Sequence, residues 1–147
     1  MKFIVEPGGS MTGSLRVPGD KSMSHRTVMF GALAEGTTTA TGFLEGQDAL
    51  CTVQAFKDMG VTIRGPEHGR IEIDGVGMHG LKAPESVIDM GNSGTSIRLL
   101  SGLLAPQSFD SVMTGDVSLQ KRPMGRVTTP LALMGAVIES EAGKPPL

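Results

Sequence analysis

The chain carries the same order of sequence patterns twice, and this internal repeat limits the folds that its 147 residues can adopt. In each copy a glycine-rich loop precedes a mostly apolar helical pattern, which is followed by a strand-like stretch and then by a helical pattern with one apolar stripe. The segment Lys57–Ile63 is mirrored by Leu133–Ile138 about 75 residues later. We therefore predict an α/β fold built from two β-α-β-α-β-β units, at about residues 17–76 and 77–147.

The spacing of apolar residues places the expected elements within each unit. In the first unit it predicts helices at 24–35 and 47–59, and strands at 37–43, 61–64 and 70–74. In the second unit it predicts a helix after the loop at 91–95, a strand near 109–114, and a helix that begins at Pro123 and buries Val127, Leu131 and Met134. Short strands are expected at 2–5 and 13–17. Because the first helix of each unit is apolar almost all round, we expect buried helices with sheets packed outside them.

Composition narrows the classes of function. The formal charge is −2 and there is no Trp or Tyr, so the chain lacks both a global attraction to nucleic acid and the aromatic platforms of single-strand binders. Its one cysteine, Cys51, excludes an internal disulfide, and we expect a structural thiol in a reduced, cytoplasmic setting. Glu6 and Pro7 come too early for a signal peptide, and no apolar run is long enough to span a bilayer, so no membrane partner is expected.

The loop at 17–26 predicts an anion-binding site. A Pro-Gly turn leads into a helix start that Ser22 or Ser24 can cap. The free N–H groups of that helix start, together with Lys21 and Arg26, would converge on one negatively charged group. The alternative is an ordinary capped surface helix with solvated charges.

Two further loops favour an anionic ligand. The loop at 91–95 has glycines that allow the backbone to approach a ligand at a second helix start. The alternative is that the same residues form only a tight turn with a capped helix. The loop that ends at Arg122 carries a basic pair, which is either solvated or able to hold a carboxylate or phosphate through two hydrogen bonds. Equivalent ends of repeated units place their loops on one rim, which would suit a polyanionic small molecule or two anionic substrates. The side chains expected on this rim are Lys21, Arg26, Asn92 and Arg122.

Other chemistries find little support in the sequence. There is no G-x-S-x-G stretch and no His-x-x-x-His pair, and the three histidines, His25, His68 and His79, are widely spaced. No G-x-G-x-x-G follows a predicted strand with an acidic residue at the distance that a dinucleotide site needs. We therefore expect no metal site and no dinucleotide site.

The three loops resemble the signature loops of the 5-enolpyruvylshikimate-3-phosphate synthase family. The matching stretches are Pro18–Arg26, Gly91–Arg98 and Gly115–Met124, and their order and spacing match over nearly the whole chain. The resemblance implies transfer of the enolpyruvyl group of phosphoenolpyruvate to the 5-hydroxyl of shikimate 3-phosphate, with release of phosphate, in the shikimate pathway of aromatic amino acid biosynthesis. It implies no metal and no organic cofactor.

The family fold implied by this resemblance has two lobes, each made of three units with the helices inside, in the manner of an inside-out α/β barrel. The active site lies in the cleft between the lobes. Because the family chain is much longer, residues 17–147 would be an incomplete first lobe, and residues 1–16 would be a strand segment that pairs with the absent lobe. The implied partners are the two substrates and the missing C-terminal part of the same enzyme, without which we expect no turnover.

Carried over residue by residue, the resemblance implies that Lys21 contacts both substrates and is the candidate for proton transfer in this chain. The other implied substrate-binding residues are Ser22 and Arg26 for shikimate 3-phosphate, and Asn92, Gly94 and Arg122 for phosphoenolpyruvate. The herbicide glyphosate would sit against Gly94. Leu99 departs from the proline of many relatives, so the helix after Gly94 is expected to differ from theirs.

Two alternative functions remain open from the sequence. The sister family transfers enolpyruvate to UDP-N-acetylglucosamine and typically has Asn and a reactive Cys where this chain has Ser22 and Val117, which argues against it. A non-catalytic anion-binding fragment that reuses part of the fold is the other alternative, and intact Lys21, Arg26 and Arg122 argue against that.

Overall fold

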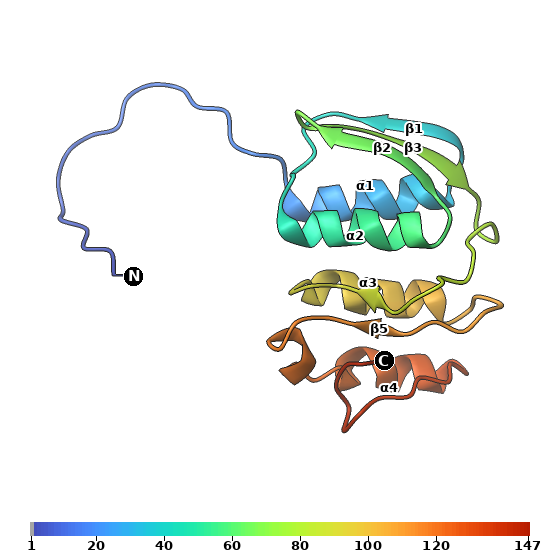
Figure 1. Ribbon diagram of the computed structural model, residues 1–147. Helices are drawn as coiled ribbons and strands as arrows, with labels where there is room; N and C mark the ends of the chain where they lie inside the picture. Colours follow the sequence, from blue (N-terminus) through green and yellow to red (C-terminus); the bar gives the residue numbers. More distant parts are fainter. Residues whose placement is uncertain (1) are drawn as a thin grey trace.

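The computed structural model describes residues 2–147, which form a stack of layers (Figure 1). A three-stranded antiparallel sheet covers α1 (Lys21–Leu33) and α2 (Gln47–Asp58), and α3 (Gly94–Leu104) lies beneath these two helices. The layer farthest from the sheet is α4 (Gly125–Leu133). The predicted α/β class is confirmed, and the described residues form no closed barrel.

The sheet belongs entirely to the first unit. Its central strand, β3 (Arg70–Val76), pairs in antiparallel fashion with β1 (Glu35–Ala40) on one side and with β2 (Thr62–Glu67) on the other. Successive side chains of a strand face opposite sides of the sheet. Ile71 and Ile73 consequently point into the helix layer, where both are fully buried.

The outer face of the sheet carries charge. Arg64, which lies opposite Glu72 in the register, donates from Nε to Glu72 Oε1 over 2.8 Å and from Nη1 to Asp74 Oδ2 over 2.7 Å. Thr37 Oγ1 donates to Asp74 Oδ1 from the neighbouring strand. These hydrogen bonds hold the pKa of the Asp74 carboxyl below its ordinary value. The predicted alternation, with isoleucines inside and charges outside, is confirmed.

The second unit has much shorter strands. β4 (Ile88–Asp89) pairs in parallel with β5 (Met113–Thr114), and α3 is the crossover between them. After β5 the chain passes through a short 3-10 helix, η1 (Leu119–Lys121), and reaches α4. α3 runs unbroken past Leu99, whose side chain is half exposed.

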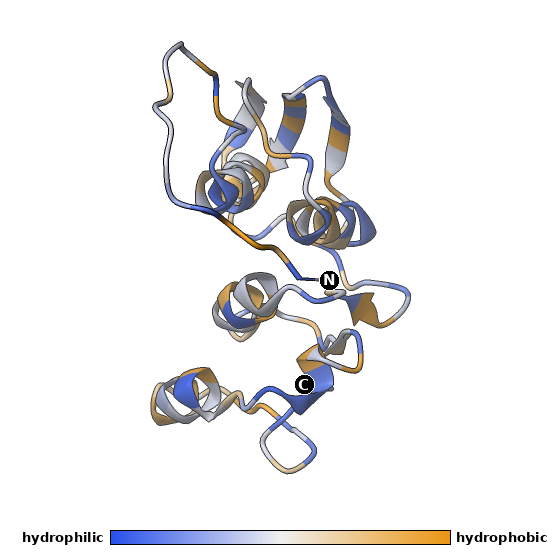
Figure 2. Ribbon diagram, turned by 90° about the vertical axis from the view of Figure 1, so that its left-hand side faces the viewer, coloured by the Kyte–Doolittle hydropathy of each residue, from blue (hydrophilic) through white to orange (hydrophobic). Residues whose placement is uncertain are grey.

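One hydrophobic core joins the sheet to α3. In Figure 2 the strands of the sheet alternate between hydrophilic and hydrophobic residues, and the helices carry apolar stripes. The core side chains from both units include Val28, Phe56, Met59, Ile71, Ile73, Ile88, Met90, Ile97, Leu100, Leu119 and Met124. Within residues 2–147 no helix combines the length and apolar character that a bilayer crossing requires.

The start of α1 differs from the prediction. The helix begins at Lys21 instead of residue 24 because Asp20 is its cap, with Oδ1 accepting from the backbone N–H of Met23 over 2.7 Å. The predicted cap at Ser22 or Ser24 is wrong: Ser24 Oγ instead donates to the Asp20 backbone carbonyl over 2.8 Å. α1 is also less enclosed than its apolar sequence predicts, since Phe30 is 68% exposed.

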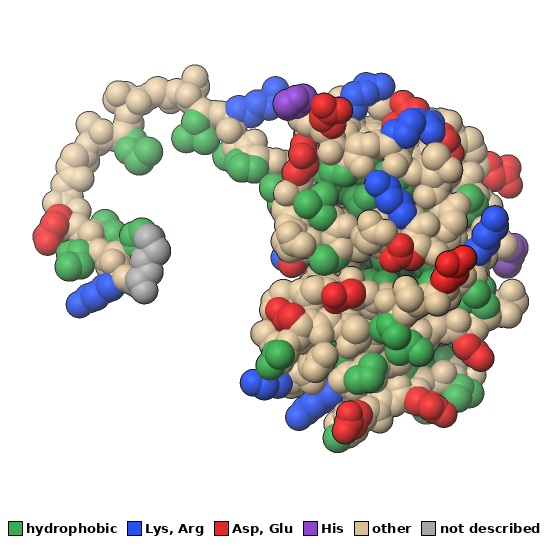
Figure 3. All heavy atoms as spheres, viewed as in Figure 1, with side chains coloured by type: hydrophobic (Ala, Val, Ile, Leu, Met, Phe, Trp, Pro, Cys, Tyr) green, Lys and Arg blue, Asp and Glu red, His purple; other side chains and the backbone are tan. Residues whose placement is uncertain are grey.

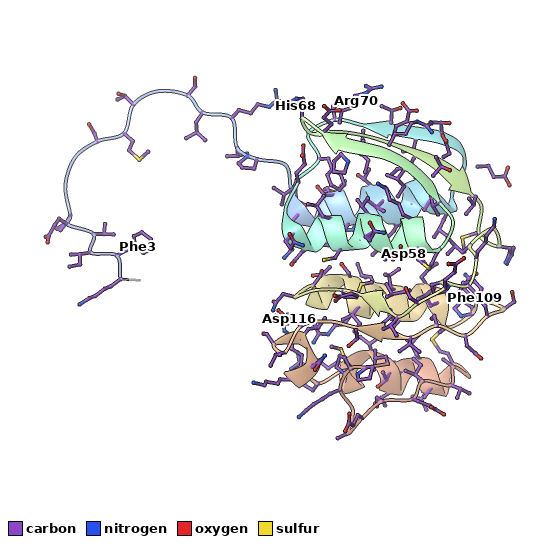
Figure 4. The ribbon with its side chains drawn as sticks, viewed as in Figure 1. Phe3, Asp58, His68, Arg70, Phe109 and Asp116 are labelled. Atoms are coloured by element: carbon purple, nitrogen blue, oxygen red, sulfur yellow. The ribbon has the colours of Figure 1, made fainter. Side chains whose placement is uncertain are left out.

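Residues 2–18 form an extended arm that stands away from the layers (Figure 1). The strands predicted at 2–5 and 13–17 are wrong for this chain, because an extended segment with no neighbouring strand has no ladder to join. Figure 3 shows hydrophobic side chains along the arm, clear of the rest of the molecule, and Figure 4 places Phe3 near its tip. The exposed apolar side chains of the arm are Phe3, Ile4, Val5, Met11, Leu15 and Val17.

The end of the second unit also differs from the prediction. α4 begins at Gly125, so Pro123 lies before the helix, and Pro130 sits inside it without a backbone N–H to donate. The predicted burial of Val127, Leu131 and Met134 is wrong, since α4 has no buried residue and Met134 is 82% exposed. In residues 135–147 the chain forms an isolated bridge, Glu141 with Lys144, in place of the last two strands of the predicted repeat.

Candidate functional site

Three helices begin along the same edge of the molecule. In Figure 1 the N-terminal ends of α1, α2 and α3 lie one above another on the side from which the arm departs, and Figure 4 shows Asp116 at that edge. The first turn of a helix leaves backbone N–H groups without helical partners and carries the positive end of the helix dipole. This edge is therefore suited to negatively charged groups.

The first loop presents Lys21 beside an acidic partner. Lys21 Nζ forms an ion pair with Asp48 at the start of α2, and both side chains remain accessible to solvent. Gly19 packs so closely on the Gly42 carbonyl that a Cβ could not be accommodated, which fixes the direction in which the chain enters α1. Lys21 is thus held at the edge by its own helix start and by α2.

The second and third loops are joined by a chain of hydrogen bonds. Arg122 Nη2 donates to Asn92 Oδ1 over 2.5 Å, and Asn92 Nδ2 donates to Asp116 Oδ2 over 2.8 Å. The other oxygen of Asp116 accepts from the backbone N–H of Leu119 over 2.7 Å. Since Asn92 accepts from a cation and donates to an anion, its amide orientation is determined by these two neighbours.

This arrangement also accounts for the charge state of Asp116. Its pKa lies below the ordinary value, chiefly because the carboxylate accepts from Asn92 and then from the Leu119 backbone. The loops are further tied by the backbone N–H of Asp116, which donates to the Gly91 carbonyl over 2.8 Å. Gly115 approaches that same carbonyl too closely for a side chain. The second and third loops therefore behave as one packed body.

Gly94 lies under two guanidinium groups. A Cβ built on Gly94 would be 2.6 Å from Arg122 Nη1 and 2.8 Å from Arg98 Nη1, so any side chain there would displace both arginines. Arg98 Nη1 donates to the Gly94 carbonyl over 3.2 Å, and Ser93 caps α3 by accepting from the Ser96 N–H. The bare backbone at Gly94 leaves two cations over the N-terminus of a helix, which is a site for a carboxylate or phosphate group.

The predicted site residues are partly brought together. Asn92, Gly94 and Arg122 form one cluster, and Lys21 lies on the same edge but pairs with Asp48. Ser22 and Arg26 are exposed on α1, and within residues 2–147 no hydrogen bond joins either of them to the other two loops. The edge therefore has two halves, one on α1 with α2 and one on α3 with the third loop.

Several contributors to this edge were missed from the sequence. Asp48 lies 27 residues from Lys21, and Asp116 lies 24 residues from Asn92, so no local pattern links either pair. A local signal did exist for Asp116, because an acidic side chain that follows a glycine in a loop often accepts a hydrogen bond from the backbone a few residues later and so stabilises a turn. Residues 2–147 contain no group of three or more His, Cys, Asp or Glu side chains placed to hold a metal ion.

Cys51 lies beneath the second loop and supports the prediction of a structural thiol. Its Sγ would be 2.9 Å from a Cβ on Gly91, so it fills the space that this glycine leaves. Burial raises the pKa of the Cys51 thiol, and the nearby carboxylates of Asp89 and Asp48 raise it further. A thiol in this environment stays protonated and is a poor nucleophile.

Two hollows of the surface are lined by residues outside the three loops. One hollow of about 600 Å³ lies at the opposite end of α3, where Leu104, Phe109, Val137 and Leu147 are among the lining residues. The side chains of the candidate site face open solvent instead. A ligand at this edge would be contacted from one side by the described residues.

Comparison with known proteins gives concordant results. Residues 5–147 match the family model described as EPSP synthase (3-phosphoshikimate 1-carboxyvinyltransferase). A relative of that name from Nitrosococcus oceani is 62% identical over 100% of this chain and 33% of its own length, and one from Alkalilimnicola ehrlichii is 63% identical over 97% of this chain and 32% of its own length.

Solved structures agree with these relatives. EPSP synthase from Acinetobacter baumannii is 67% identical and superposes with a TM-score of 0.87, covering 91% of this chain and 31% of that one. The chain therefore spans about a third of the length of the curated relatives that it matches.

Proposed function

Because the chain belongs to the EPSP synthase family, we propose that it supplies one side of the active site of a 3-phosphoshikimate 1-carboxyvinyltransferase. The proposed reaction transfers the enolpyruvyl group of phosphoenolpyruvate to the 5-hydroxyl of shikimate 3-phosphate and releases phosphate. The observation that carries the proposal is the cluster of Asn92, Gly94 and Arg122 at the start of α3, on the same edge as Lys21.

The reacting groups explain why this edge is cationic. In the first step the 5-hydroxyl oxygen bonds to C2 of phosphoenolpyruvate and gives up its proton to a base, while C3 gains a proton from an acid. In the second step the C2–O bond to phosphate breaks and C3 loses a proton, which restores the double bond. Two phosphates and a carboxylate must share one site throughout, so cations that offset their repulsion also bring the hydroxyl toward C2.

The described side chains divide this work between the two halves of the edge. Arg122 and the backbone at Gly94 would hold phosphoenolpyruvate, with Asn92 oriented by Asp116 to assist. On the other half Ser22 and Arg26 would hold shikimate 3-phosphate. Lys21 would contact both substrates. Its ammonium is the group in this chain that we propose for proton delivery, after exchange of Asp48 for a substrate anion.

We further propose that the chain alone does not turn over substrate. Each charged contact on an open surface is worth about 1 kcal/mol or less, so binding should be weak and sensitive to salt. Catalysis would need a second body of protein to exclude water and to bring charges from the opposite side. We propose that this body is the remaining part of the same enzyme, that residues 1–16 pair with it, and that residues 17–147 are two units of one lobe. The cytoplasmic location stays a prediction.

A titration tests the binding proposal. The chain should bind phosphoenolpyruvate and shikimate 3-phosphate more tightly than UDP-N-acetylglucosamine, as measured by calorimetry at low salt. Arg122→Gln should weaken phosphoenolpyruvate binding by up to about fivefold. Arg70→Gln, the same change on the outer face of the sheet, is the matched control and should leave affinity unchanged. A preference for UDP-N-acetylglucosamine would favour the sister reaction, and equal loss in both variants would favour a non-specific anion binder.

A second experiment tests turnover. Phosphate release from the two substrates should be absent with the chain alone and should appear when the unmatched part of the Nitrosococcus oceani relative is added as a separate polypeptide. The Arg122→Gln chain in the same mixture should be much less active than the Arg70→Gln chain. Turnover by the chain alone would refute the proposal that a second body is required.

A further inference from the structure

A line of buried hydrogen bonds connects the three helices that begin at the candidate edge. His25 Nδ1 on α1 lies 2.8 Å from Thr52 Oγ1 on α2, and Thr52 Oγ1 lies 2.6 Å from Ser96 Oγ on α3. Ser96 Oγ also lies 3.4 Å from His25 Nδ1 itself, and it continues to Ser93 Oγ over 2.6 Å. All four side chains are fully buried. We refer to His25, Thr52, Ser96 and Ser93 as the buried polar line.

The buried polar line ends beneath the two halves of the edge. His25 directly precedes Arg26 on α1, and Thr52 lies one helical turn after Asp48, the partner of Lys21. At the other end Ser93 and Ser96 flank the first turn of α3, where Ser93 Oγ accepts from the Ser96 N–H and Gly94 lies between them. The line therefore runs underneath the site from one anion loop to the other.

Packing alone does not account for these residue types. Thr52 could be replaced by isosteric Val, and apolar side chains of similar volume usually stabilise a core at least as well as buried polar groups do. The line also carries a cost, because His25 Nε2 is buried with no hydrogen-bond partner in the described chain. Hydrogen bonds, unlike apolar contacts, fix distance and direction. What the line adds to an apolar core is a defined position of α3 relative to α1 and α2.

His25 remains neutral in this environment. Burial lowers the pKa of its imidazole, and the nearby ammonium of Lys21 lowers it further while the Asp48 carboxylate raises it. A neutral imidazole offers one donor and one acceptor, so Nδ1 can complete the line with either polarity of the hydroxyl groups. The line therefore joins the helices without placing a buried charge under the site.

We propose that the buried polar line is a positioning device that sets the spacing between the Lys21–Arg26 loop and the Asn92–Gly94 loop. This inference rests on the proposed function in one respect, since the two loops are taken to bind the two substrates. His25, Thr52, Ser93 and Ser96 are positioning residues that touch neither substrate. They act by holding the first turn of α3, and with it the Gly94 backbone, at a fixed place beside the start of α1.

The test removes one hydroxyl and keeps the shape. Thr52→Val removes the two short hydrogen bonds of Thr52 Oγ1 without changing volume and leaves only the 3.4 Å contact of Ser96 Oγ with His25 Nδ1 between α1 and α3. Thr52→Ser restores the hydroxyl. Ile97→Val is the matched control, because it removes one buried methylene group from the same face of α3 and leaves the line intact. Ser96→Ala breaks the line at its middle and replaces Thr52→Val if that variant does not fold.

Two measurements are made on each variant. The first is amide hydrogen exchange of Gly94 and Thr95 by NMR without ligand, relative to amides of β3. We expect roughly three- to tenfold faster exchange in Thr52→Val, and wild-type rates in Thr52→Ser and Ile97→Val. The second is affinity for phosphoenolpyruvate, measured with and without saturating shikimate 3-phosphate. In Thr52→Val, most of the increase in phosphoenolpyruvate affinity that saturating shikimate 3-phosphate produces in the wild type should be lost.

The outcomes separate the positioning role from a merely structural one. If Thr52→Val lowers the melting temperature but changes exchange and affinity no more than Ile97→Val does, the inference is overturned. Failure of Thr52→Ser to restore exchange would also overturn it. If the wild-type chain binds neither substrate, the proposed function fails, and the ligand-free exchange comparison then decides the positioning role by itself.

Discussion

The two units share a sequence pattern but differ in how they are closed. In the first unit the Met-Gly segment after α2 leads to Val61 and Ile63, which are buried because β2 pairs with β3. In the second unit the equivalent Met134 is 82% exposed and Val137 is 92% exposed. The same local pattern therefore forms a helix in both units, while a strand forms only where a partner strand is present.

The difference between the two units shows that a sequence repeat determines the local helices strongly. The repeat determines much less strongly which residues become buried in the folded chain. A helix satisfies its own backbone hydrogen bonds, whereas a strand requires a neighbour to satisfy its N–H and C=O groups. In residues 135–147 of the second unit, strand-like pairing is limited to the bridge of Glu141 with Lys144 and to the two backbone hydrogen bonds that Leu147 exchanges with Met113 of β5. The stability of the chain should accordingly be concentrated in the first unit.

Truncation of one apolar side chain at the end of each unit's pattern, buried in the first unit and exposed in the second, would break or confirm this comparison most directly. Ile73→Ala, on the buried face of β3, should lower the free energy of unfolding by about 2–5 kcal/mol through lost burial and a new cavity. Leu133→Ala, at the exposed end of α4, should change it by about 0.5 kcal/mol or less. Urea denaturation measures both. Similar losses in the two variants would show that the second unit is as closed as the first.

A second prediction concerns a tightly packed part of the second unit, the start of α3. Gly94→Ala should displace the guanidinium groups of Arg122 and Arg98, because its Cβ would lie within 3 Å of both. We expect about a fivefold loss of phosphoenolpyruvate affinity, equivalent to about 1 kcal/mol. The melting temperature should hold or rise, since Ala favours a helix more than Gly does.

Gly102→Ala is the control for that prediction. Gly102 also lies on α3 but has open space around it, so the same substitution should leave affinity unchanged. If both variants lose affinity equally, the effect belongs to the helix and not to the arginines. If neither loses affinity, the cluster at Gly94 does not bind phosphoenolpyruvate.

The third prediction uses pH to probe the first unit. Because the pKa of His25 is lowered in the folded state, the unfolded chain binds more protons below its ordinary pKa of about 6.5. The free energy of unfolding should therefore fall as the pH falls from about 7 to 5. Melting temperatures across this range should show a shallower decline in His25→Gln, whose amide can still reach Thr52. The same slope of melting temperature against pH in His25→Gln and in the wild type would mean that other titrating groups dominate the pH dependence.

The smallest expected effect lies in the third loop of the second unit. The lowered pKa of Asp116 means that its carboxylate contributes stability above the unfolded pKa, and that this contribution is lost as the pH falls through the folded value. Asp116→Ala should flatten the stability profile slightly at acidic pH, and it should broaden the side-chain amide signals of Asn92 in NMR spectra. Asp110→Ala, an exposed change in the same unit, should do neither.

Much of the fold could be predicted from the sequence, because the spacing of apolar residues along a helix and their alternation along a strand are local properties. The spacing of apolar residues located the helices, and the alternation of Ile71 and Ile73 with charged residues identified β3 and its buried face. The glycine loops located the cluster at Gly94. Family membership, suggested by the three loops together, was confirmed by comparison.

What the sequence could not predict depends on long-range contacts. Asp20 and two nearby serines are all residue types that can cap a helix, and in the folded chain the Asp20 carboxylate caps α1. The contact of His25 with Thr52 spans 27 residues and the contact of Thr52 with Ser96 spans 44, so neither has a local signature. The exposure of α4 could not be predicted either, because burial of an apolar stripe depends on a partner surface.

The arm at residues 2–18 has a kinetic consequence. It joins the folded layers at Gly19, which is packed against Gly42, directly before the cap of α1 and Lys21. Eighteen or so extended residues reach about 60 Å. A polypeptide that captures the tip of the arm would therefore become tethered beside the candidate edge. Its encounter with that edge would then be intramolecular, at an effective concentration set by the length of the tether instead of by the solution.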